Sequence, residues 1–244
     1  MAALAGFATL AFILAGSAVG IRLLRLAATR GTAPERSIGR GLFLIAGVAY
    51  PASIVMRLES APDPVRSLAF GIAMAALAIG STYLVAFARD VFRPEDPWAR
   101  VVVWAMGAAW AVLFAVSVFV ALTASPDEFF SAGPRFLARQ ALLLATFCWT
   151  SIEAASYWWK LRRRERVGLV EREVTNRMAL WCIAGTSSLC SSAIATVVGL
   201  TGIDPLADPM ASLVTGVAGL AASASLVLAF LPPKAYLAWV RGTT

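Results

Sequence analysis

Residues 101–123 read VVVWAMGAAWAVLFAVSVFVALT, a run of 23 residues without a charged side chain. A helix needs about 20 consecutive apolar residues to cross the hydrocarbon core of a lipid bilayer. Because no water is available there to bind backbone groups, an apolar run of this length is expected to be helical throughout. The stretch therefore predicts a transmembrane helix.

The same pattern recurs on both sides of this stretch. Short charged segments rich in proline and glycine separate the apolar runs, for example Arg93-Pro-Glu-Asp-Pro97, and such segments interrupt helices. We predict an all-α membrane protein with one domain, residues 1–244, that forms a single bundle of seven transmembrane helices. The predicted spans are about 3–24, 40–58, 67–88, 98–123, 137–159, 176–199 and 209–231.

Some positions are expected to shape the helices and their packing. Pro51 lies inside the second predicted span and should bend it, because proline lacks the amide hydrogen of a helical residue. Small residues such as Gly71, Gly216 and Gly219 are expected to let helices approach closely. The amphipathic segment Lys234–Arg241 is predicted to lie along the membrane surface.

The composition agrees with this architecture. Hydrophobic residues make up 59% of the chain and charged residues 14%, whereas soluble domains have about 25% charged residues. The net charge of +7 could suggest binding to nucleic acid. However, the basic residues lie in short blocks between apolar runs, which is typical of membrane topology. We therefore expect the lipid bilayer, and no nucleic acid, as a partner.

The distribution of Lys and Arg predicts the orientation. Of the 21 basic residues, 17 fall in the connections on one side of the predicted bundle. The other four are Arg57, Arg66, Arg135 and Arg139. Short cytoplasmic loops contain the excess of Lys and Arg in membrane proteins. The N-terminus is therefore expected outside and the C-terminus in the cytoplasm.

Several activities are disfavoured by missing residues. The chain has no histidine, so zinc hydrolases, haem proteins with a histidine ligand and serine proteases with a histidine base are excluded. A retinal protein needs a lysine in the middle of its seventh helix, where this chain has only small and apolar residues at 216–223. We therefore expect no metal, no cofactor, no retinal and no enzymatic activity.

Glu153 is the main candidate for a functional residue. It is the only carboxylate well inside a predicted span, and such residues normally face the bundle interior or a watery cavity. Thr146, Thr150 and Tyr157 share its helical face, because the spacings are four, three and four residues. Arg139 also lies on this face but is too far along the helix to pair with Glu153.

Hydroxyl groups on neighbouring spans are the expected partners of Glu153. Thr82 and Tyr83 lie at nearly the same depth on the third span, and Thr186 lies on the sixth. Together they predict a polar seam that forms a ligand or proton site, in which Glu153 is protonated when the seam is dry. The alternative is that these hydroxyl residues are ordinary contacts between membrane helices.

A strongly basic segment follows the fifth span. It is expected to contact either anionic lipid at the cytoplasmic face or a protein partner. Its basic residues are Lys160, Arg162, Arg163, Arg164 and Arg166.

Two segments in the last third of the chain suggest a family. Arg172-Glu-Val-Thr-Asn-Arg-Met-Ala-Leu-Trp181 and Phe230-Leu-Pro-Pro-Lys-Ala-Tyr236 resemble segments of uncharacterised bacterial seven-helix membrane proteins. They are also similar to the seven-helix input modules of sensor kinases and cyclases. The resemblance implies a multi-pass protein of the bacterial inner (plasma) membrane that acts through a separate partner.

These observations favour a stand-alone membrane sensor that binds a small or lipid-like ligand near Glu153. A small-solute transporter or channel, with Glu153 as its proton-coupling group, is the first alternative. An accessory subunit of a larger membrane complex, with no ligand of its own, is the second.

Overall fold

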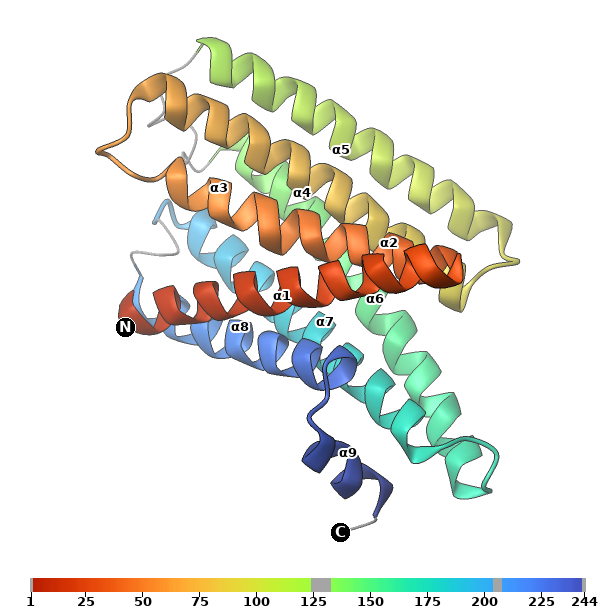
Figure 1. Cartoon of the computed structure of the whole chain (residues 1–244). Helices are drawn as coiled ribbons and strands as arrows, with labels where there is room; N and C mark the ends of the chain where they lie inside the picture. Colours follow the sequence, from red (N-terminus) through yellow and green to blue (C-terminus); the bar gives the residue numbers. More distant parts are fainter. Residues whose placement is uncertain (1, 124–132, 204–207, 243–244) are drawn as a thin grey trace.

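The computed structural model describes residues 2–123, 133–203 and 208–242, and every regular element within them is a helix. Residues 33–55 form one continuous rod, hereafter the α2–α3 rod, and the other elements follow in chain order (Figure 1). The elements are α1 (Ala2–Arg30), α2 (Ala33–Leu42), the π-helical η1 (Phe43–Ala49), α3 (Tyr50–Val55), α4 (Asp63–Phe92), α5 (Pro97–Thr123), α6 (Pro134–Arg166), α7 (Arg172–Leu200), α8 (Pro209–Phe230) and α9 (Lys234–Arg241).

Six helices of the described residues are long and apolar enough to cross a membrane. They are α1, the α2–α3 rod, α4, α5, α7 and α8. The prediction of a multi-pass helical membrane protein is therefore confirmed, with six such helices among the described residues. The fifth predicted span corresponds to α6, which has 33 residues but is less apolar than the others, since Arg139, Gln140 and Glu153 interrupt it.

Prolines mark the starts of helices rather than only their ends. Pro97, Pro134 and Pro209 are the first residues of α5, α6 and α8. The first turn of a helix tolerates proline because its amide groups have no acceptor within the helix and its φ angle is already helical. The predicted span 209–231 begins at its proline, whereas the predicted starts at 98 and 137 lie one and three residues after Pro97 and Pro134.

The bend expected at Pro51 takes the form of a wider helical turn. Residues 43–49 are π-helical, and the amide of Tyr50 donates to the carbonyl of Ile45, five residues earlier. Proline cannot donate, and its ring collides with the carbonyl four residues before it. The π-helical segment ahead of Pro51 allows the helix to continue through the proline.

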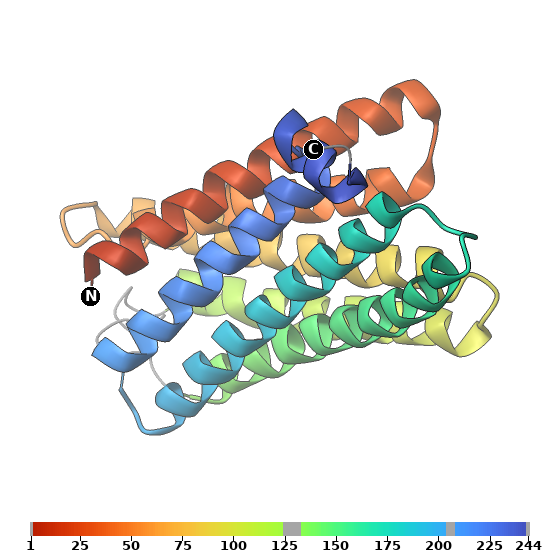
Figure 2. The same ribbon diagram turned by 90° about the horizontal axis from the view of Figure 1, so that it is seen from below.

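The helices form a ring. In spatial order, α1 packs against α8, α8 against α7, α7 against α6, α6 against α4, and α4 against the α2–α3 rod, which returns to α1 (Figure 2). Helix α5 lies outside the ring, mainly against α4. Its outward face is apolar and exposed, at Val101, Trp104, Val112, Phe119 and Leu122.

Apolar side chains fill the centre of the ring. All its helices contribute buried residues to one cluster, among them Val19, Ile45, Leu84, Ala154 and Leu226. A second cluster, around Trp110, joins α4 to α5. Most of the 17 basic residues identified above lie at the end of the ring where α1, α4 and α6 finish and α7 begins. This end is called the basic end below.

Glycines bring the α2–α3 rod against its neighbours on both sides. A Cβ atom on Gly20 of α1 would lie 2.8 Å from the Phe43 amide nitrogen and 3.1 Å from the Gly39 carbonyl oxygen. On the other side, a Cβ on Gly41 or on Gly80 of α4 would lie 3.1 Å from the carbonyl oxygen of the other glycine. The backbones are therefore almost in contact at two glycine crossings, as in tightly packed membrane helices.

The glycines expected to mediate packing behave differently from one another. Gly216 and Gly219 of α8 face Leu4 and Ala8 of α1, so they do lie at a helix interface. Gly71 of α4 does not, because a Cβ there would have none of the described atoms within 4 Å. The small size of Gly71 therefore did not indicate whether this residue faces a neighbouring helix.

Replacing Gly20 with alanine should destabilise the bundle. The added methyl group would press on the backbone of the α2–α3 rod, and overpacking of this kind costs about 1–3 kcal/mol. Thermal unfolding in detergent measures the effect. Gly71→Ala is the matched control, because it removes a helical glycine in open space and should stabilise by up to about 1 kcal/mol. Equal unfolding midpoints for the two variants would contradict the glycine crossing.

Candidate functional site

Glu153 binds an arginine that the sequence analysis did not consider. Its side chain is 9% exposed, and both carboxylate oxygens accept from Arg93 Nε at 3.0 Å. Arg93 is the residue directly after α4, 60 positions before Glu153. The pair therefore joins α6 to the connection between α4 and α5 at the basic end.

Arg93 also interacts with Asp96 of its own connection and with Trp98 in the first turn of α5. Its Nη1 donates to Asp96 at 3.4 Å, and its guanidinium carbon lies 5.8 Å from the centre of the Trp98 ring. The hydrogen bond and charge of Glu153, followed by those of Asp96, raise the pKa of Arg93 above its already high ordinary value. The arginine remains charged, and it lies between two carboxylates on different elements.

An aromatic layer lies next to the Glu153–Arg93 pair. Tyr157 of α6 packs on Phe92, Phe87 packs on Trp181 of α7, and Trp181 packs on Phe230 at the end of α8, with ring centres 5.5, 5.5 and 5.9 Å apart. Phe87 and Phe92 themselves are 6.2 Å apart. The layer crosses the ring from α6 to α8. In the adjacent pair the Glu153 carboxylate is nearly buried, whereas the Arg93 side chain is 38% exposed.

The threonines of α6 do not bind Glu153. The hydroxyl of Thr146 donates to the Leu142 carbonyl at 2.8 Å, and that of Thr150 donates to the Thr146 carbonyl at 2.9 Å. Both are buried. Threonine in a helix commonly bonds to the preceding turn in this way, so a shared face did not mean a shared hydrogen bond.

The residues expected on neighbouring spans also face other partners. Thr82 bonds to the Ala78 carbonyl, and its methyl group faces Gly107 of α5. Tyr83 accepts a hydrogen bond from Arg40 of α2 at 3.1 Å. Thr186 of α7 is exposed. The polar seam is therefore not assembled from these side chains, because equal depth in the membrane does not fix which way a side chain points. Of the predicted site residues, Glu153 binds Arg93 and Tyr157 belongs to the aromatic layer beside it.

The basic segment at the end of α6 is open to the surroundings. Arg162 and Arg163 lie over the rings of Trp158 and Trp159, at 5.4 and 5.7 Å from the ring centres. The remaining basic side chains of the segment are exposed as well, namely Lys160, Arg164 and Arg166.

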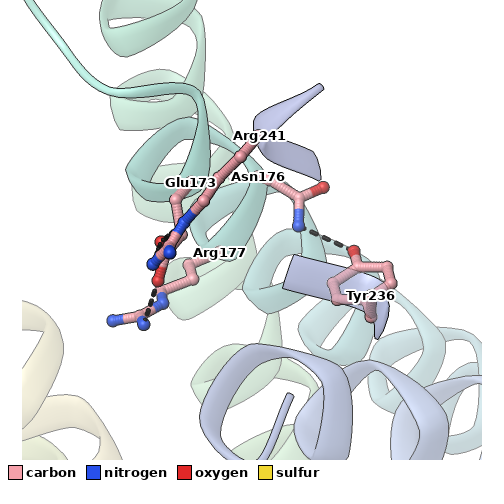
Figure 3. Close-up of polar contacts among 5 residues, drawn as sticks. All are labelled: Glu173, Asn176, Arg177, Tyr236 and Arg241. Atoms are coloured by element: carbon pink, nitrogen blue, oxygen red, sulfur yellow. Dashed lines mark hydrogen bonds and ion pairs between the residues drawn. The ribbon is translucent and has the colours of Figure 1, made fainter. Parts of the chain in front are cut away.

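Helix α9 is bound to the first turns of α7 (Figure 3). The Asn176 side-chain amide donates to the Tyr236 hydroxyl at 2.7 Å. Glu173 accepts from Arg241 of α9 at 2.7 Å and from Arg177 of α7 at 2.5 Å. The two segments on which the family resemblance rests therefore lie against each other. In the connections at the end of the bundle opposite the basic end, Asp127, Glu128 and Asp204 lie outside the described residues.

No protein-family model, curated protein or solved structure matches this chain. The resemblance to bacterial seven-helix proteins and to sensor input modules therefore stays a prediction.

Removing either partner of the Glu153–Arg93 pair should destabilise the protein. Arg93→Ala leaves a nearly buried carboxylate without its cation, and Glu153→Ala leaves the arginine without its main acceptor, so each should cost about 1–3 kcal/mol. Glu153→Gln should cost less than Glu153→Ala, because it keeps the shape and one acceptor. Thermal unfolding of the single and double variants gives the coupling energy, expected at about 1 kcal/mol or more. Arg100→Ala, at an exposed arginine of α5, is the control and should change little. Strictly additive effects would show that the pair is not formed.

Proposed function

We propose that this chain is a seven-helix membrane sensor of the bacterial inner membrane, in which α6 crosses the membrane in addition to the six apolar helices. At about 1.5 Å per residue, 33 residues are more than enough to cross roughly 30 Å of hydrocarbon. The ion pair with Arg93 reduces the penalty of placing Glu153 inside the membrane. The excess of Lys and Arg at the basic end supports a cytoplasmic location for that end and for α9.

The observation that supports sensing is that Arg93 lies between two carboxylates. Glu153 belongs to α6, whereas Asp96 belongs to the same connection as Arg93. A ligand or proton that neutralises Glu153 leaves Arg93 with Asp96 alone, and the α4–α5 connection is then no longer held to α6. Such an element has two states, and a stimulus with different affinity for the two states shifts their populations.

The other functions considered from the sequence receive less support. A transporter or channel needs a path along the bundle, and the aromatic layer fills the ring near its basic end. For an accessory subunit, the exposed apolar face of α5 is available to a second membrane protein, but bulk lipid covers such a face equally well.

The orientation can be tested by cysteine labelling of intact cells after Cys148, Cys182 and Cys190, which form no disulfide, are replaced by alanine. A cysteine at Arg164 should not react with a membrane-impermeant maleimide until the cells are broken, because the basic end faces the cytoplasm. A cysteine at the exposed Glu59 should react in intact cells. The reverse pattern would contradict the orientation.

The two-state element can be tested by distance measurement between spin labels at Arg100 of α5 and Lys160 of α6, both exposed. Glu153→Gln should add a population with a longer distance, because the neutral amide binds Arg93 more weakly. Asp96→Asn should narrow the distance distribution seen in the wild type, because Arg93 then no longer divides its charge between Asp96 and Glu153. Identical distributions in all variants would rule out this sensing element.

A further inference from the structure

A cleft of about 480 Å³ lies at the basic end, between the last turns of α1 and the start of α7. Four of its six lining residues are arginines. The lining residues are Arg22, Arg25, Leu26, Thr29, Arg30 and Arg177, and they are called the arginine cleft here.

The cleft exists because α8 is shorter than its neighbours. Helix α8 packs against both α1 and α7 but ends at Phe230. Figures 1 and 2 both show α1 continuing beyond this point. Past the end of α8, the two helices lose the element that separates and covers them. The side chains of α1 and α7 at this end then line the space between the two helices.

Those side chains concentrate positive charge. Arg22, Arg25 and Thr29 follow the i, i+3, i+7 spacing of one helical face. Arg22, Arg25 and Arg30 are exposed and make no ion pair with any residue that the structure describes.

Arg177 completes the cleft from the opposite helix. Glu173 holds it in place with a 2.5 Å ion pair and also binds Arg241 (Figure 3). One carboxylate, already shared between two arginines, does not balance the charge of the cleft.

We propose that the arginine cleft binds the phosphate group of an anionic ligand, either a phospholipid headgroup or a soluble phosphate ester. Guanidinium groups bind phosphate oxygens through paired, charge-assisted hydrogen bonds. The volume lies in the usual range of ligand sites, about 300–1,000 Å³, and leaves room for an organic group beside the phosphate. This site is separate from the basic segment at the end of α6 and does not depend on the proposed sensing role of Glu153.

A more ordinary explanation accounts for part of the cleft only. Basic residues in the last turn of a helix stabilise its partly negative end, and Arg30 is in that position in α1. The effect falls off within one turn, whereas Arg22 and Arg25 lie further back in the helix. Their convergence with Arg177 on one cleft is what indicates a bound anion.

The proposal can be tested by native mass spectrometry of the full chain in a neutral detergent. Inorganic pyrophosphate is one probe and short-chain phosphatidic acid is the other, and each is titrated to saturation. The test variant is Arg22→Gln/Arg25→Gln/Arg30→Gln. The control is Arg100→Gln/Arg172→Gln/Lys234→Gln, which removes three exposed positive charges from the same end of the bundle but outside the cleft.

The wild type should bind one equivalent of probe, and the cleft variant should bind about tenfold more weakly or worse, as expected for the loss of at least one charge-assisted hydrogen bond. The control should retain wild-type affinity. Binding of phosphatidic acid but not of pyrophosphate would identify a lipid headgroup, and binding of pyrophosphate but not of phosphatidic acid would identify a soluble phosphate compound. Binding of both would support a site that recognises the phosphate group alone.

Absence of saturable binding to the wild type would overturn the proposal, as would equal losses in the two triple variants. The replaced arginines make no ion pair with the described residues, so the cleft variant should fold, and its unfolding midpoint without probe checks this. If the triple variant does not fold, Arg25→Gln and Arg100→Gln give the same comparison, and equal affinities of those two variants would likewise overturn the proposal.

Discussion

The α2–α3 rod is held on both sides by contacts between backbones. Gly20 and Gly39 form the crossing with α1, and Gly41 and Gly80 form the crossing with α4. In lipid the hydrophobic effect does not drive helices together, so close van der Waals packing has to do so. These crossings set the position of α4, and through it the position of Arg93 opposite Glu153. They also fix the position of the last turns of α1 in the bundle, and therefore the position of the arginines on those turns.

Two acidic residues near the basic end each bind an arginine from a distant element. Glu153 binds Arg93, and Glu173 of α7 binds Arg241 of α9. Both arginines belong to the group whose distribution predicts the orientation, so the same residues serve topology and tertiary contact. An ion pair in such surroundings is a weak source of net stability, because desolvation opposes the attraction. The ion pair instead specifies which helices contact each other, because a different arrangement of the helices would leave the carboxylate or the arginine without its partner.

The sequence predicts the helices well and their side-chain contacts poorly, for an identifiable reason. Apolar runs must be helical inside a bilayer, so 98–123 and 209–231 correspond closely to α5 and α8. The partner of Glu153 depends on the order of helices around the ring, which hydropathy does not contain. One signal was present, because Arg93 lies five residues after the predicted span 67–88, at the same end as Glu153, and a long arginine side chain can reach back along a helix end. Thr146 and Thr150 could not be assigned from spacing, since their hydroxyls bond to their own helix.

The pairing of α1 with α8 has a consequence for how the protein is made. Leu4 and Ala8 face Gly216 and Gly219, roughly 200 residues later in the chain. Ribosomes add about 5–20 residues per second, so the first helix waits about 10–40 seconds for its last neighbour. During that interval the ring is open, and lipid or an insertion factor covers the face that α8 will occupy. Closure of the ring is therefore a late event of biosynthesis, after the α2–α3 rod has packed on α1 and α4 has packed on the rod.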